Sequence, residues 1–285
     1  MNAKKLKGFF KLIRFELPFA AGICVLSGQL LALKEFPSMQ LAALGFLSVF
    51  TISASILVLN DYFDIETDKI NAPYRPIPSN VLTKTEALYF SIFLLIIGFA
   101  SSLLININSF ICIFVLTLLG YLYNRRFKKC GLLGNLIVSF SVGMTFIYDG
   151  ISVGFPLDKH ILFFAFTAAL IDLGEEIASD AMDAKGDLLI GSNSLAIKYG
   201  KPFALKVSTI IFLVVITFSF LPLLLSWFSV IYLIPILIMD AFILFPVIKL
   251  YNIENDDSGR KYIRIIYLGS TLGILIFIAI LLLSE

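Results

Sequence analysis

Nine long apolar stretches recur along the chain, and they restrict its possible folds more than any other feature. Each is roughly 16 to 25 residues long, and a helix needs about 20 apolar residues to cross the hydrocarbon core of a bilayer. Hydrophobic residues make up 59% of the 285 residues and the mean hydropathy is +0.95, which is too apolar for a soluble globular protein. The stretches lie near residues 16–34, 39–60, 86–105, 107–123, 133–152, 160–179, 205–223, 226–249 and 264–283. The sequence therefore predicts an all-α polytopic membrane protein, a single domain over residues 1–285 built as a bundle of nine transmembrane helices.

The basic residues indicate how this bundle is oriented. If the N-terminus and every second connection are assigned to one side, only Lys34 and Lys159 of the 22 Lys and Arg residues fall on the other side. By the positive-inside rule, the N-terminus and the connections after the second and sixth stretches are cytoplasmic. The net charge of +2 is too small to indicate a nucleic-acid partner. We expect a multi-pass protein of the cell membrane, in contact with lipid; its oligomeric state stays open.

An acidic motif follows the second apolar stretch, where residues 60–80 read NDYFDIETDKINAPYRPIPSN. Asp61, Asp64 and Asp68 are spaced i, i+3 and i+7, so on a helix they share one face. Hard divalent ions such as Mg²⁺ bind carboxylate oxygens and complete their shell with water and substrate phosphates. Downstream, Arg75 lies in a proline-rich turn, where its planar guanidinium can bind a pair of anionic oxygens. A divalent ion and this arginine together suit a diphosphate.

A second motif with the same spacing follows the sixth stretch. Residues 180–187 read DAMDAKGD and contain Asp180, Asp183 and Asp187. Either triad alone could be the polar face of a solvated helix. However, carboxylates are costly so close to a membrane unless they have a function, and both triads face the predicted cytoplasmic side. We therefore interpret both as metal-binding motifs.

Together these features fit a substrate with a diphosphate head and a hydrocarbon tail. A metal ion would neutralise the charge that develops on the departing diphosphate. If the tail is allylic, an apolar helical bundle would shield the resulting carbocation from water, and a tyrosine such as Tyr62, Tyr121 or Tyr123 could stabilise it. Glu175 and Glu176 lie about one turn before the second motif and could extend its acidic face. No role follows from the sequence for Asp240.

The two motifs resemble those of the UbiA-type intramembrane prenyltransferases, including the asparagine before the first aspartate and the Arg-Pro-Ile-Pro segment. The segments KKCGLLGN (128–135) and SLAIKYGK (194–201) also resemble that family. The resemblance implies a nine-helix fold and an Mg²⁺-dependent transfer of a prenyl group. It implies that six aspartates bind Mg²⁺, with Asp64, Asp68, Asp183 and Arg75 as the catalytic residues. The metal ligands would be Asp61, Asp64, Asp68, Asp180, Asp183 and Asp187, and the substrate would contact Asn60, Arg75, Lys128, Tyr123 and Asn135.

Within the family, the chain most resembles the archaeal ether-lipid branch. The resemblance rests on its compact length and on residues 176–187, which follow the pattern EIxxDxxDxxGD. That resemblance implies a geranylgeranyl diphosphate donor and a geranylgeranylglyceryl phosphate acceptor. The sequence departs from the branch at Glu175, where an arginine is expected, and at Ser179, which is often basic. The segment RRFKK (125–129) or the region from Arg260 to Arg264 would then have to bind the acceptor phosphate.

Two other functions remain possible from the residues. The first keeps the chemistry but transfers the prenyl group to an aromatic acceptor such as a hydroxybenzoate, a naphthoate or a porphyrin. The second is a cation transporter with two acidic half-sites. Transporters of that kind place their charges at the membrane midplane on broken helices, whereas these triads lie at the ends of the apolar stretches.

Overall fold

The computed structural model describes residues 3–283, and within that range every regular element is helical. The prediction of an all-α fold is confirmed. The α-helices are α1 (Ala3–Ile13), α2 (Glu16–Leu33), α3 (Met39–Phe63), α4 (Ile65–Asn71), α5 (Lys84–Ile105), α6 (Ile107–Arg125), α7 (Leu132–Val153), α8 (Lys159–Asp187), α9 (Leu195–Tyr199), α10 (Lys201–Ser219), α11 (Leu221–Leu224), α12 (Leu233–Leu250) and α13 (Asp256–Leu283). The short 3₁₀ helices are η1 (Phe127–Cys130), η2 (Leu188–Ile190) and η3 (Val230–Tyr232).

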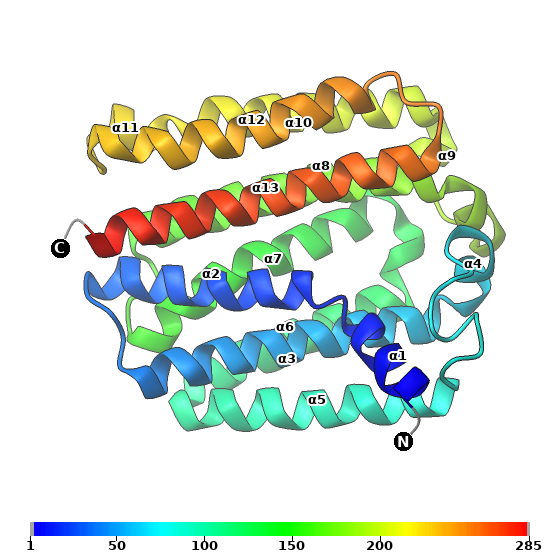
Figure 1. Cartoon of the computed structure of the whole chain (residues 1–285), viewed down its shortest axis with the longest axis horizontal. Helices are drawn as coiled ribbons and strands as arrows, with labels where there is room; N and C mark the ends of the chain where they lie inside the picture. The colour runs from blue at the N-terminus through cyan, green and yellow to red at the C-terminus, as the bar shows by residue number, and fades with distance from the viewer. Residues whose placement is uncertain (1–2, 284–285) are drawn as a thin grey trace.

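The long helices lie side by side along the length of the molecule (Figure 1). Helix α3 packs against α5 and α2, α7 packs against α6 and α8, and α8 packs against α10. The chain closes on itself because α13 contacts both α8 and the early helix α2. Helices α1, α4 and α9 lie at one end of the bundle, and α11 lies at the other (Figure 1).

Eight helical segments within residues 3–283 are long and apolar enough to cross a membrane. They correspond to eight of the nine predicted spans. The ninth, predicted over 160–179, falls in α8, which has 29 residues but carries several carboxylates. That α8 crosses the membrane therefore stays a prediction.

Two apolar cores flank the centre of the bundle. One joins α8, α10, α12 and α13 around buried side chains such as Phe212 and Ile266. The other joins α1, α3 and α5 around Leu12 and Val58. Between them, the inward faces of the central helices carry polar groups, and these faces form the site.

The structure corrects one local expectation. The first acidic motif does not lie on one uninterrupted helix, because α3 ends at Phe63 and α4 begins at Ile65. Asp64 stands at the junction, although backbone hydrogen bonds from its N–H to the Asn60 carbonyl (2.9 Å) and from the Asp68 N–H to its own carbonyl (2.8 Å) continue through it. The second motif lies wholly within α8, which continues through Asp187.

Candidate functional site

A cavity of about 970 Å³ lies at the centre of the bundle, and both acidic motifs line it. It receives Asp61 and Asp68 from the first motif and Asp180, Asp183 and Asp187 from the second. Its remaining wall is largely apolar and comes from α2, α3, α6, α7, α8 and α13. One chamber therefore combines a charged end with an apolar interior.

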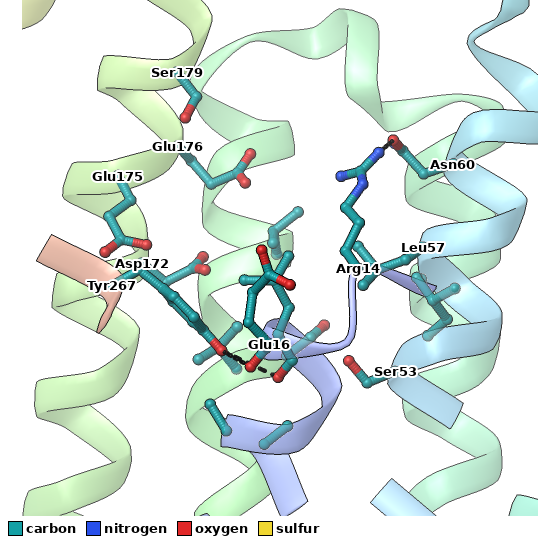
Figure 2. Close-up of a pocket in the computed structure, with 18 of the residues that line it drawn as sticks. Arg14, Glu16, Ser53, Leu57, Asn60, Asp172, Glu175, Glu176, Ser179 and Tyr267 are labelled. Carbon is teal, nitrogen blue, oxygen red and sulfur yellow. Dashed lines mark hydrogen bonds between the residues drawn. The ribbon is translucent and has the colours of Figure 1, made fainter. Parts of the chain in front are cut away.

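The end of α3 is held by a set of polar contacts around Asp61, whose side chain is almost completely buried. The Arg14 guanidinium pairs with Asp61 and also donates to the Asn60 Oδ1 atom at 3.5 Å. Asn60 in turn donates to the Asn124 Oδ1 atom of α6 at 3.1 Å. Arg14 adopts a left-handed backbone conformation, with φ of 46°, at the turn between α1 and α2. This turn directs its side chain across to α3, as Figure 2 shows.

Arg75, from the proline-rich turn, lies against the same motif. Its Nη1 atom is 2.5 Å from Asp68 Oδ1 and 3.3 Å from Asp61 Oδ1. Burial raises the pKa of the Asp68 carboxyl, although the positive charge of Arg75 opposes this shift. The second oxygen of Asp68 is buried without a hydrogen-bond partner in the described part of the chain. It is an anionic oxygen available to a cation.

Lys128 in η1 pairs with Asp64 and extends into the cavity. Burial alone would lower the pKa of Lys128, but the neighbouring carboxylates, Asp64 foremost, outweigh burial and raise it. Lys128 therefore keeps its positive charge inside the site. Arg125 in the same basic segment instead donates to the Tyr121 hydroxyl at 2.6 Å and is solvent-exposed.

The second motif is held by contacts from α7 and α13. Asp183 Oδ1 accepts from Arg260 Nη2 at 2.7 Å and from Arg260 Nε at 3.1 Å. Asp180 Oδ2 accepts from the Asn135 side chain at 3.0 Å. Burial raises the pKa of the Asp187 carboxyl to about 7, and Lys128 opposes the shift. All six aspartates are therefore close to a basic or amide side chain, or to both.

Further carboxylates of α8 line the same cavity in the turns that precede the second motif. Figure 2 shows Asp172, Glu175 and Glu176 facing the same space as Arg14 and Asn60. Asp172 accepts from the Ser139 hydroxyl at 3.0 Å, and Glu176 from the Tyr123 hydroxyl at 3.4 Å. Glu175 and Glu176 thus line the same cavity as the second motif, and their part in its acidic face stays a prediction.

Two arginines of α13 form another part of the cavity wall. Both Arg260 and Arg264 line the cavity, and the Arg264 Nη2 atom pairs with Glu16 Oε1 at 2.7 Å. The Tyr267 hydroxyl donates to the Glu16 carbonyl at 2.6 Å, so it ties α13 to the start of α2 (Figure 2). The sequence offered two basic regions for the acceptor phosphate. The cavity receives Arg260 and Arg264 from the first turns of α13, and Lys128 from the RRFKK segment.

The aspartates of the two motifs suit a hard divalent cation, because they offer carboxylate oxygens as ligands. One of these oxygens, Oδ2 of Asp68, is buried and has no hydrogen-bond partner in the described part of the chain. Across residues 3–283, no three His, Cys, Asp or Glu side chains converge closely enough to hold one ion by themselves. Mg²⁺ does not need such a set, since it commonly binds one or two carboxylates and takes its other ligands from water and substrate phosphate. The predicted ligands fit that kind of site.

Sequence reasoning missed three residues of the site. Arg14 was counted only as a topology charge, although it pairs with Asp61. Asn71 lies inside the first motif and bonds to α8, and Asn124 bonds to Asn60. A polar side chain close to a motif was the only sequence signal that could have identified them. Their partners are distant in sequence, so the signal did not show what they contact.

The chain matches the UbiA prenyltransferase family over residues 21–282. It is 34% identical to a digeranylgeranylglyceryl phosphate synthase from Sulfurisphaera tokodaii, over 93% of this chain and 95% of the relative. A structure solved in work on digeranylgeranylglyceryl phosphate synthase in membranes is 33% identical and has a TM-score of 0.67, with 95% of this chain and 98% of that one covered. A UbiA homologue from Archaeoglobus fulgidus bound to DMAPP and Mg²⁺ is 17% identical and has the same fold, with a TM-score of 0.69 over 94% of this chain and 98% of that one.

Proposed function

Because the chain belongs to the UbiA prenyltransferase family, we propose that it transfers a geranylgeranyl group from geranylgeranyl diphosphate to the free hydroxyl of geranylgeranylglyceryl phosphate. The bond between the first prenyl carbon and the diphosphate oxygen breaks, and an ether bond to the glycerol oxygen forms. The diphosphate leaves and the hydroxyl proton is released. The product carries the second ether bond of an archaeal membrane lipid. The similarity to relatives named for this synthase supports the choice of donor and acceptor.

One observation carries this proposal: the two acidic motifs and the Arg260 and Arg264 wall line the same cavity. Such a chamber can bind two anionic head groups at once. The diphosphate would bind between the motifs, and the acceptor phosphate would bind at the α13 arginines, where guanidinium groups favour phosphate oxygens.

The six aspartates named from the sequence would hold Mg²⁺ together with the diphosphate. Asp61, Asp64 and Asp68 would act from one side of the cavity, and the aspartates of α8 from the other. A bound Mg²⁺ supplies positive charge against the oxygens of the departing diphosphate. The A. fulgidus relative, which shares the fold and was solved with DMAPP and Mg²⁺, supports the use of a divalent metal beside the diphosphate, while the choice of these six ligands comes from the sequence motifs.

Other side chains would bind and position the donor. Arg75 and Lys128 would donate to the diphosphate oxygens, and Asn60 would hold the end of α3 next to them. Asn135 would orient Asp180, to which it is already bonded. Tyr123 would present its ring to the reacting carbon, and the apolar lining would exclude water.

The eight candidate spans and the family match make this a multi-pass membrane protein. We place it in the cell membrane as a single domain, with its N-terminus and active site on the cytoplasmic side. The distribution of Lys and Arg residues supports this orientation. The acceptor and donor would both reach the cavity from the membrane.

A transfer assay tests the proposal. Purified protein in detergent is given labelled geranylgeranyl diphosphate and either geranylgeranylglyceryl phosphate or 4-hydroxybenzoate, with Mg²⁺ or with EDTA. We expect a doubly alkylated glyceryl phosphate that requires the metal. Product from the aromatic acid alone would overturn the acceptor, and product formed equally well in EDTA would overturn the metal assignment.

A further inference from the structure

A second, smaller pocket adjoins the apolar interior of the cavity. Its volume is about 70 Å³, and it lies among α8, α12, α13 and the segment that follows α11. Its lining is almost entirely apolar and includes the aromatic side chains of Phe163, Phe228, Tyr232 and Phe277. The residues that line both the pocket and the main cavity are Phe146, Ala168, Ile171, Ser270 and Ile274. A wall one side chain thick therefore separates the two spaces.

Helix α13 links this pocket to the arginines at the cavity's charged end. Arg260 and Arg264 stand near the start of α13, and Ser270, Ile274 and Phe277 line the pocket further along it. Phe277 follows Arg260 by 17 residues (277 minus 260) and Arg264 by 13 residues (277 minus 264), which is about 26 Å and about 20 Å at 1.5 Å per helical residue. A chain whose phosphate is bound by these two arginines must therefore be about 20 to 26 Å long to fill the pocket.

From its phosphorus to its last backbone carbon, geranylgeranylglyceryl phosphate has roughly 21 bonds, and an extended chain gains at most about 1.2 Å per bond. Its full reach is then about 25 Å, so the terminal isoprene unit would arrive at Phe277. Each isoprene unit adds four bonds, or about 5 Å. A farnesyl chain, one unit shorter, reaches about 20 Å, which is the least that the pocket requires. With its phosphate at Arg260 it would end at the level of Ile274, in the dividing wall.

The donor chain has a different path. The cavity also extends along α3, α6 and α7, where Val49, Ile113 and Tyr148 line it. Tyr148 is completely buried and its hydroxyl lies 2.6 Å from the Ser48 hydroxyl, so its ring forms a fixed end to this path. This path begins beside the first motif and Lys128, where the diphosphate is placed.

We propose that the pocket between α8, α12 and α13 receives the terminal isoprene unit of the acceptor, and that it selects acceptors with a twenty-carbon chain. This inference rests on the proposed function. It requires Ile274 or a neighbouring wall side chain to move aside, because these side chains now separate the pocket from the cavity. The donor chain would lie toward Tyr148 and would not enter the pocket.

Substitution in the wall tests the inference. Ala168→Phe places a ring where the pocket meets the cavity, so we expect kcat/KM for the geranylgeranyl acceptor to fall at least about tenfold relative to the farnesyl acceptor. Ile274→Ala widens the same wall, so acceptors one isoprene unit longer should become better substrates. The donor preference should stay unchanged in both variants. If Ala168→Phe fails to fold, the acceptor preference of Ile274→Ala still tests the inference independently.

Phe166→Leu is the matched control, because Phe166 lies on the same helix but is 53% exposed on its outer face. Its acceptor preference should equal that of the wild type. An unchanged ratio of the two acceptors in both wall variants would overturn the inference while leaving the proposed function intact, as would a shift in donor length alone. A wild-type protein that alkylates no glyceryl phosphate of any chain length would overturn both.

Discussion

Asn71 at the end of α4 donates from its side-chain Nδ2 atom to the backbone carbonyl of Asp183 in α8, over 3.1 Å. Its Oδ1 atom accepts from the Gly186 N–H, also at 3.1 Å. One amide side chain therefore links the two acidic motifs. The contact also explains why residue 186 is a glycine, because a methyl group at this position would overlap the Asn71 side chain.

We expect Asn71→Ala to lower kcat about tenfold, since two hydrogen bonds, each worth about 1 kcal/mol, no longer hold the motifs together. The unfolding temperature should fall by a few degrees. Steady-state transfer kinetics and thermal unfolding in detergent measure both effects. Asn193→Ala is the control, because Asn193 is exposed and its side chain makes a long 3.5 Å hydrogen bond to the Lys129 carbonyl, while its backbone N–H bond to the same carbonyl is kept. Wild-type activity in Asn71→Ala would show that the link has no catalytic importance.

Asp64→Asn and Asp183→Asn should each reduce kcat at least about 100-fold, because each removes a negative charge that binds the metal and diphosphate. Both proteins should remain folded, as judged by their unfolding temperature. Glu66→Gln is a matched control on α4: Glu66 is exposed and pairs only with Lys69, at 2.8 Å, three residues away. Normal turnover in either aspartate variant would refute the metal-site assignment.

Most of the site residues named from the sequence line one cavity, whereas the ends of the helices were predicted less accurately. Hydropathy detects the part of a helix that lies in the bilayer, so the last span was predicted from residue 264, whereas α13 begins at Asp256. The extra two turns are polar and bring Arg260 to the second motif. In the same way, α8 extends beyond residue 179 to carry the whole second motif on one helix.

What the sequence could not predict are contacts between distant segments. The spacing of Asp61, Asp64 and Asp68 predicted a shared helical face, because spacing records local geometry, and the cavity receives Asp61 and Asp68 of the three. The pairing of Arg14 with Asp61 and of Asn71 with Asp183 depends on how helices pack, and no local periodicity records it. The break at Asp64 depends on the same packing.

Arg75→Ala should raise the KM for the donor more than the KM for the acceptor. Arg75 lies 2.5 Å from Asp68 in the first motif, beside the proposed diphosphate site, and its guanidinium would bind two diphosphate oxygens. Kinetics with each substrate varied in turn measure the two constants, and Arg75→Lys should recover only part of the loss because it lacks the planar donor pair. An effect confined to the acceptor would contradict the assignment.

Arg264→Gln should raise the acceptor KM about tenfold and leave the donor KM nearly unchanged. Arg264 is the better test of the acceptor phosphate site, since it pairs with Glu16 rather than with a predicted metal ligand, whereas Arg260 pairs with Asp183. A charge-assisted contact with phosphate is worth about 1.5 to 3 kcal/mol, which is consistent with that change. Arg125→Gln is the control from the other basic segment, because Arg125 is exposed and bonded to Tyr121. If Arg125→Gln raises the acceptor KM and Arg264→Gln does not, the phosphate binds at the RRFKK segment instead of at α13.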